Sequence, residues 1–365
     1  MKNPRTLALY DVGQRLWLDN ISRQLLQSGT LTRYIRDLSV TGLTSNPTIF
    51  EHAIATGTLY DESIRVLTTA GMSGEPLFFE LALEDLTQAA ELFRPIFEAS
   101  HASDGWVSLE ISPLLAHDAN GTIGAAARLH AQATCANLLI KIPGTPEGIV
   151  ATEQSIFAGI PVNVTLLFSC DHYLAAAHAY VRGLERRAAL GLDLKVGSVA
   201  SLFVSRWDLA ADRMITGPFH NRLGVAIATR AYKAYRELLI SDRWKKLERA
   251  GARPQRLLWA STGTKDPAAS DTMYVEALAA EDTINTIPEK TLLAFADHGK
   301  VSAPLLVEAG YAEDIIAKLR HEGLDDNALA SRLQREGVAD FAKSWRTLLT
   351  RIGEKSHPLV SAVSA

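Results

Sequence analysis

Short β-rich segments alternate with longer helical segments over the first 300 or so residues of the chain. Helical segments such as 76–100, 171–190 and 224–250 place apolar residues three and four positions apart, the spacing of amphipathic helices. Eight strands interleaved with helices predict an α/β fold, a (β/α)8 TIM-type barrel. The β-rich segments begin at Arg15, Ser39, Gly105, Asn137, Pro161, Val196, Arg256 and Thr283.

The pattern becomes purely helical after Gly299, so additional C-terminal helices are expected. No segment rich in Pro, Gly or Ser separates them from the barrel. Barrels of this class commonly reach this length as one unit. We therefore expect residues 1–365 to form a single barrel domain, with residues 300–365 as a helical extension packed on it.

Polar residues occupy alternate positions in two of the expected strands, which indicates that they share one face. A strand packed on both sides should be apolar on both, so this pattern predicts a barrel lumen that holds a polar ligand. The apolar residues between them, Val164, Leu166 and Phe168 in the second strand, are expected on the outer face. The polar residues are Ser108, Glu110 and Ser112 in the first strand, and Asn163, Thr165 and Ser169 in the second.

Lys141 stands in the middle of the apolar segment NLLIKIPG, where a charged side chain works against folding. Alternation places it with Leu139 and opposite Ile140, so its side chain is expected to point into the barrel. Burial disfavours the charged ammonium and makes the neutral amine available to attack a carbonyl. The sharpest interpretation is a Schiff-base lysine. The alternatives are a side chain buried only along its stem and a structural ion pair with Glu110.

Composition excludes several other classes of protein. The 37 basic and 41 acidic residues leave a net charge of −4, without the basic stripe that nucleic acid requires. No apolar run approaches a membrane span, and the N-terminus has no apolar signal segment. Cys135 and Cys170 lie in no CxxC motif or histidine cluster, so no disulfide framework or metal site is expected. A cytoplasmic location is the expectation.

Several motifs, taken in order, resemble the class I transaldolases, in particular longer bacterial-type chains. The resemblance covers roughly residues 15–300. It implies a transferase of the nonoxidative pentose phosphate pathway. Such an enzyme moves a dihydroxyacetone unit between sedoheptulose 7-phosphate or fructose 6-phosphate and glyceraldehyde 3-phosphate or erythrose 4-phosphate. The motifs are SVTGLTSNPTIF, SLEISP, NLLIKIPGTPEGI, PVNVTLLFS, VGSVASLFVSRWD, LLWASTGT and NTIPEKTLLAF.

The resemblance also implies a division of catalytic roles. Lys141 would form the imine with the C2 carbonyl of the ketose phosphate, and Asp19 would take the proton from the C4 hydroxyl. Glu110 and Thr165 would hold the water that relays protons during imine formation. Other interpretations remain: Asp19 as the cap of a following helix, Glu110 as a counter-ion for Lys141, and Thr165 as an ordinary strand residue.

Substrate-binding residues follow from the same resemblance. Asn46, Asn163 and Ser201 would bind the dihydroxyacetone part, although Asn46 precedes a proline and would also suit a turn. Arg206 would grip the phosphate with its planar guanidinium, the alternative being a surface ion pair. Ser261 would place a hydroxyl beside the same phosphate.

Two positions bear on how the chain differs from its relatives. Many relatives carry an arginine soon after the serine that matches Ser261, whereas this chain has STGTKDP. Lys265 is therefore the candidate for the second cation at the phosphate. Relatives that are simple aldolases usually carry a tyrosine where this chain has Phe203. A phenylalanine keeps the site drier and favours transfer, although filling the core is the more common task of this residue.

Three alternative functions remain. They are a fructose-6-phosphate-type aldolase, a pyridoxal phosphate barrel with Lys141 as its aldimine residue, and a non-catalytic barrel that binds sugar phosphates. The preferred interpretation needs neither metal nor organic cofactor, because the protonated imine is itself the electron sink. Its expected partners are small-molecule sugar phosphates, and the protein would be a monomer or a homodimer.

Overall fold

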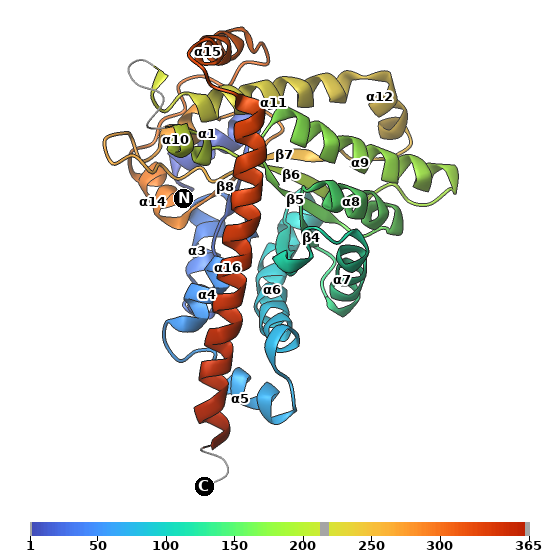
Figure 1. The fold of residues 1–365 in the computed structure, drawn as a ribbon, viewed down its shortest axis with the longest axis vertical. Helices are drawn as coiled ribbons and strands as arrows, with labels where there is room; N and C mark the ends of the chain where they lie inside the picture. Colours follow the sequence, from blue (N-terminus) through green and yellow to red (C-terminus); the bar gives the residue numbers. More distant parts are fainter. Residues whose placement is uncertain (1, 212–218, 362–365) are drawn as a thin grey trace.

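The computed structural model describes residues 2–211 and 219–361, and within them eight parallel strands form a closed barrel. The strands pair in chain order and β8 pairs with β1, which confirms the predicted (β/α)8 fold (Figure 1). The strands are β1 (Arg15–Leu18), β2 (Val40–Thr44), β3 (Val107–Glu110), β4 (Leu138–Pro143), β5 (Val162–Leu167), β6 (Ser198–Phe203), β7 (Arg256–Ala260) and β8 (Ile284–Ile287).

Helices surround this barrel, and in the described part of the chain none is long and apolar enough to cross a membrane. They are α1 (Pro4–Val12), α2 (Arg23–Gln27), α3 (Thr30–Asp37), α4 (Pro47–Ala55), α5 (Asp61–Thr69), α6 (Gly74–Ala99), the 3-10 helix η1 (Pro113–Leu115), α7 (Ala119–Gln132), α8 (Pro146–Ala158), α9 (Cys170–Ala189), α10 (Ser205–Ala211), α11 (Leu223–Ile240), α12 (Asp242–Arg249), α13 (Met273–Ala277), α14 (Glu289–His298), α15 (Gly310–His321) and α16 (Asp326–Ser361).

Polar caps start the helices that follow β2, β4 and β5. Asn46, Thr145 and Ser169 each accept a hydrogen bond from the backbone N–H three residues further along. Such caps satisfy N–H groups that have no partner inside the helix. The strand therefore passes into the helix within a few residues. The prediction that Ser169 belongs to the lumen is wrong, because its hydroxyl caps α9 instead.

The amino-terminal end of the lumen is filled by aromatic side chains. Trp17 is fully buried, and its Nε1–H donates a hydrogen bond to Oδ1 of Asp104 over 2.9 Å. Gly42 makes room for it, because a Cβ atom at this position would lie 2.7 Å from the indole ring. Trp106 and Leu139 belong to the same inner cluster. The lumen is therefore packed at this end, and the cavity inside the barrel lies nearer its carboxyl end.

The alternation predicted for β5 ends at a bulge. Leu166 has a φ of 58°, and the pairing of β5 with β6 is irregular at this point. The side chains of Leu166 and Phe168 consequently pack in the inner cluster with Phe203, whereas Val164 packs in the outer core. The prediction that Leu166 and Phe168 face outward is wrong, since an extra residue in a strand reverses the faces that follow it.

The helical segment predicted over 224–250 divides into α11 and α12. Ser241 between them is extended, with a ψ of 147°, and its hydroxyl accepts a hydrogen bond from the N–H of Trp244. A serine that caps a new helix offers the backbone an alternative to continuing the old one. Apolar periodicity continues through the break, so it did not reveal the change of direction.

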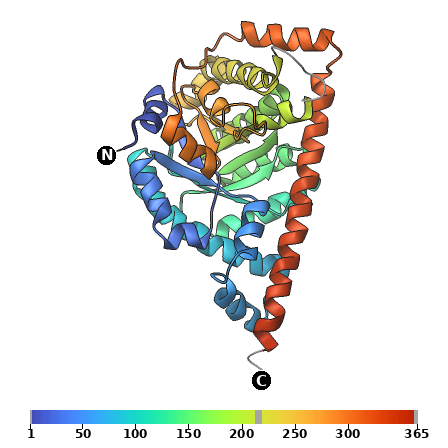
Figure 2. The same cartoon turned by 90° about the vertical axis from the view of Figure 1, so that its left-hand side faces the viewer.

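The long helix α16 runs along one side of the molecule and past the barrel (Figures 1 and 2). The helix α15 lies at the upper end of the molecule in both views. Trp345 anchors α16: the indole is fully buried and donates a hydrogen bond to Glu75 of α6 over 2.8 Å. Nearer the N-terminus of α16, Gln334 donates to the carbonyls of Gly144 and Leu166. These contacts agree with an extension packed on the barrel, while the expected single-domain organisation stays a prediction.

Candidate active site

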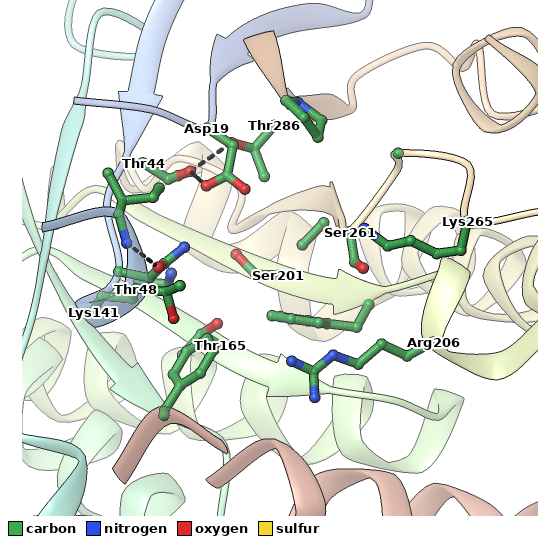
Figure 3. A pocket seen from close by; sticks show the side chains of 17 residues that line it. Asp19, Thr44, Thr48, Lys141, Thr165, Ser201, Arg206, Ser261, Lys265 and Thr286 are labelled. Carbon is green, nitrogen blue, oxygen red and sulfur yellow. Dashed lines mark hydrogen bonds between the residues drawn. The ribbon is translucent and has the colours of Figure 1, made fainter. Parts of the chain in front are cut away.

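A cavity of about 240 Å³ opens at the carboxyl ends of the strands, the usual place for the active site of such a barrel. Figure 3 shows polar side chains from different strands converging on it. Lys141 lies on one side, and Arg206, Ser261 and Lys265 lie across the cavity from it. The lining residues are Asp19, Thr44, Asn46, Thr48, Ile49, Lys141, Thr165, Ser201, Phe203, Arg206, Ala260, Ser261, Gly263, Lys265, Thr286, Pro288 and Phe341.

The inward position predicted for Lys141 is confirmed by its surroundings. Only 5% of the residue is exposed, and its Nζ donates a hydrogen bond to the carbonyl of Ser45 over 3.0 Å. Nζ also lies 3.1 Å from Oε2 of Glu110, which is on the neighbouring strand β3. The amine is thus held at the cavity edge by one carbonyl and one carboxylate.

Glu110 lies below the cavity rather than in its described lining. Burial raises the pKa of this carboxyl to about 7, although the nearby Lys141 ammonium opposes the rise. Neither oxygen has a well-aligned hydrogen bond within the described residues, and the same holds for the buried Oγ1 of Thr165. These atoms can therefore accept or donate protons when another polar group reaches them.

Asp19 stands at the end of β1 and lines the cavity. Thr44 Oγ1 donates a hydrogen bond to its Oδ1 over 2.9 Å, and Thr44 Oγ1 lies 2.6 Å from Thr286 Oγ1. A hydroxyl has one proton, so Thr286 donates to Thr44 and Thr44 to Asp19. Desolvation raises the pKa of Asp19, against the attraction of Lys141. Asp19 is not the cap of the next helix, because Ser22 caps α2.

A second hydrogen-bonded chain crosses the lumen floor through Asn163. Its Nδ2–H donates to Oγ of Ser108, and its Oδ1 accepts a bond of 2.7 Å from Oγ of Ser201. Ser201 lines the cavity, whereas Asn163 is fully buried and is absent from the described lining. The two predicted substrate-binding residues are thus joined, with the serine nearer to the ligand. Ser112 points elsewhere, donating to Glu75 of α6.

Asn46 combines two of the predicted possibilities. Its Oδ1 accepts the backbone N–H of Ile49 over 3.0 Å and so caps α4, and the residue also lines the cavity. Capping occupies the amide oxygen and fixes the side-chain orientation. The amide nitrogen is the group with which Asn46 can bind a ligand.

The opposite side of the cavity carries two cations. Arg206 from α10 and Lys265 from the loop after β7 both line it, as does Ser261. Nη1 of Arg206 donates to Oδ2 of Asp340 on α16 over 3.0 Å, so the alternative of an ion pair is realised within the site itself. A guanidinium and an ammonium that share one wall suit a phosphate group.

Phe203 lies two residues after Ser201 in β6, and both residues line the cavity. Its ring centroid lies 5.3 Å from that of Phe168, and the Arg206 guanidinium lies 5.8 Å from the Phe203 ring centroid. With 8% of the residue exposed, Phe203 is packed on one side and borders the cavity on the other. Phe203 therefore both fills the core and shapes the site.

Eight of the described lining residues were not assigned from the sequence, and four of them carry a hydroxyl or an aromatic ring. Thr44 is the last residue of β2 and Thr286 is the residue before the last in β8, and their place near polar strand ends was a usable signal. Thr48 is the second residue of α4, where nothing in the sequence distinguishes it from a surface threonine. Phe341 comes from the helical extension, and no local pattern connects it to the barrel.

The described ranges contain no group of three or more His, Cys, Asp or Glu side chains arranged to hold a metal ion. The expectation that the protein works without a metal or an organic cofactor stays a prediction.

Comparison with known proteins places this geometry in context. Residues 16–352 match the family model described as Transaldolase/Fructose-6-phosphate aldolase. A transaldolase of Thiobacillus denitrificans is 44% identical over 350 residues, covering 94% of this chain and 98% of the relative. One of Saccharopolyspora erythraea is 43% identical over 360 residues, covering 97% and 98%, respectively. The resemblance predicted from the motifs is confirmed, and the chain belongs to the transaldolase/fructose-6-phosphate aldolase family.

Proposed function

We propose that this protein is a transaldolase that transfers a dihydroxyacetone unit through a Schiff base on Lys141. The donors would be sedoheptulose 7-phosphate or fructose 6-phosphate, and the acceptors glyceraldehyde 3-phosphate or erythrose 4-phosphate. The observation that carries the proposal is the buried amine of Lys141 at the cavity edge, beside Glu110 and in the same cavity as Asp19. The similarity to relatives named transaldolase supports the choice of reaction.

Imine formation would begin with attack of Nζ of Lys141 on the C2 carbonyl. One proton moves from nitrogen to the C2 oxygen to give the carbinolamine, and a second proton on that hydroxyl lets it leave as water, which leaves a protonated imine. Glu110 supports this exchange because a pKa of about 7 lets it both donate and accept near neutral pH. Thr165 adds a buried hydroxyl from the adjacent strand β5.

Cleavage would follow when Asp19 removes the proton from the C4 hydroxyl. The C3–C4 bonding electrons move into the protonated imine and give an enamine, and the aldose phosphate leaves. Attack of the enamine on an acceptor aldehyde forms the new C–C bond, and Asp19 returns its proton to the new alkoxide. The hydrogen bond from Thr44 fixes the carboxylate orientation, which supports this assignment.

The phosphate group would bind across the cavity from the imine, at Arg206, Ser261 and Lys265. Asn46 and Ser201 would bind hydroxyls of the dihydroxyacetone part, with Asn163 orienting Ser201 from below. Fixed polar groups of this kind position the substrate without competing as nucleophiles.

The family also contains simple aldolases, which release dihydroxyacetone to water. Phe203 favours transfer, since the cavity wall at this point presents an aromatic ring without a hydroxyl that could deliver a proton. The length of the chain points the same way, since its transaldolase relatives match it over nearly their whole length.

Sodium borohydride reduction tests the proposal directly. With fructose 6-phosphate present, reduction should add one dihydroxyacetone-derived group per chain, and peptide mass mapping should locate it on Lys141. Lys141→Met should abolish both the label and transfer to glyceraldehyde 3-phosphate. Labelling of Lys195 or Lys265 instead would refute the assignment.

The proposal extends to the setting of the reaction. Small sugar phosphates would be the only partners needed, in the cytoplasm and within the nonoxidative pentose phosphate pathway. The protein would act as a monomer or a homodimer. Cell fractionation and light scattering of the purified protein measure these two properties.

A further inference from the structure

Phe341 brings the C-terminal helix into the cavity. It lies in α16, about 200 residues beyond Lys141 in sequence, yet both residues line the same cavity. Nζ of Lys141 lies 5.8 Å from the centroid of the Phe341 ring, within the range of a cation–π contact. The residue is 6% exposed and belongs to the hydrophobic cluster that contains Phe203.

We propose that Phe341 is an active-site residue that stabilises the protonated imine on Lys141 and limits the access of water to it. The inference rests on the proposed transaldolase function and adds a role for the helical extension. In this view α16 completes the active site that the barrel strands begin.

The position of the ring is fixed by contacts on either side of it along α16. Gln334 donates hydrogen bonds to the carbonyls of Gly144 and Leu166 at the ends of β4 and β5, over 2.9 and 3.0 Å. Because Leu166 sits in the bulge, its carbonyl has left the regular ladder and accepts a bond from α16. One helical face thus carries the contacts to the barrel.

Gly337 lets α16 approach the barrel closely. A Cβ atom at this position would lie 2.9 Å from Cδ2 of Leu166, closer than side chains tolerate. Gly337 and Trp345 lie four residues to either side of Phe341, so all three share a helical face. Since Trp345 is fully buried, the intervening ring has little freedom to leave the cavity.

Two physical effects follow from this placement. The imine carries a positive charge, and the face of an aromatic ring attracts a cation, more strongly where water is excluded. The ring also covers apolar volume that water would otherwise enter, and the enamine then persists until an aldehyde arrives. Substitution by leucine retains the cover and removes the π face, whereas alanine removes both.

The test compares Phe341→Leu, Phe341→Ala and a control, Leu348→Ala. Leu348 is fully buried on the same helix and is absent from the described cavity lining, so its truncation reports on looser packing of α16 alone. Borohydride labelling at subsaturating fructose 6-phosphate measures the imine. Release of dihydroxyacetone without an acceptor, divided by transfer to glyceraldehyde 3-phosphate, measures the access of water.

Phe341→Leu should lower imine labelling about threefold to tenfold, with an unchanged ratio of release to transfer. Phe341→Ala should lower labelling similarly and raise the ratio about tenfold. Leu348→Ala should lower the melting temperature and leave both readouts as in the wild type. If Phe341→Ala matches the wild type or Leu348→Ala in both readouts, the inference is overturned while the proposed function stands. Absence of labelling in the wild type would instead overturn the proposed function, and the inference with it.

Discussion

Nζ of Lys141 lies 3.1 Å from Oε2 of Glu110, and both side chains are almost completely buried. Nζ donates its hydrogen bond to the Ser45 carbonyl. Glu110 therefore interacts with the amine through its charge and not through a well-aligned hydrogen bond. A carboxyl with a pKa of about 7 beside an amine can change its protonation during a reaction. This pair is the centre of the expected imine chemistry.

The two carboxylates should act at different steps. Asp19→Asn should lower the rate of C–C cleavage about a hundredfold or more while imine still forms, because the amide cannot take the C4 proton. Glu110→Gln should instead slow imine formation by a similar factor. Rapid-quench borohydride labelling separates the two steps. If both variants form imine at the wild-type rate, the roles are misassigned.

The raised pKa of Glu110 predicts a pH-dependent stability. The carboxyl has an ordinary pKa of 4.5 and a folded-state pKa of about 7, so between these values the folded protein holds a proton that the unfolded chain releases. Protonation therefore favours folding, and the free energy of unfolding falls as pH rises through this window. Across this window, the free energy of unfolding of the wild type should fall by about 1–3 kcal/mol more than that of Glu110→Gln.

Urea denaturation of both proteins at pH values below and above this window measures the difference. Asp19, whose pKa is also raised, is present in both proteins, so its own contribution largely cancels in the comparison. A difference that stays constant with pH, or that favours the wild type at higher pH, would contradict the prediction.

Phe203→Tyr should shift the enzyme from transfer toward free aldolase activity. A phenolic hydroxyl in this wall gives the enamine a nearby proton donor, and a positioned proton-transfer group is worth about a hundredfold in rate. Dihydroxyacetone release from fructose 6-phosphate, without an acceptor, is the measurement. Phe203→Leu is the control, since it changes the ring without adding a hydroxyl. An equal ratio of release to transfer in Phe203→Tyr and the wild type would assign Phe203 to packing alone.

Asp340 should compete with the substrate phosphate for Arg206. The ion pair of 3.0 Å is partly exposed, with 62% of the Asp340 side chain accessible, so its energy is small. Asp340→Asn should therefore lower KM for fructose 6-phosphate by about twofold to fivefold and leave kcat unchanged. Arg206→Ala should raise KM about tenfold or more.

Glu336→Gln supplies a matched control, because it removes the same charge from α16 at a residue that pairs with Arg332 instead. Steady-state kinetics at constant ionic strength distinguishes the variants. If Asp340→Asn and Glu336→Gln change KM equally, the effect is one of net charge, and Asp340 does not compete at Arg206.

The sequence by itself determined the barrel and the position of Lys141 inside it. Alternation of strands and helices is a local property, because each element has its own apolar period, and it led to the closed barrel. The inward side of Lys141 followed from the same period of two, since β4 is regular. Polar residues at successive strand ends indicated a site because parallel strands bring those ends together.

Tertiary structure alone decided the rest of the site. Because of the bulge at Leu166, the residues after Thr165 face the opposite side from the one that alternation predicted, and no local residue pattern indicated the bulge. Phe341 lines the cavity and Asp340 pairs with Arg206 in its wall because α16 crosses this end of the barrel, a contact between segments far apart in sequence. Periodicity shows which face of a helix is buried, but the partner of that face depends on the three-dimensional path of the whole chain.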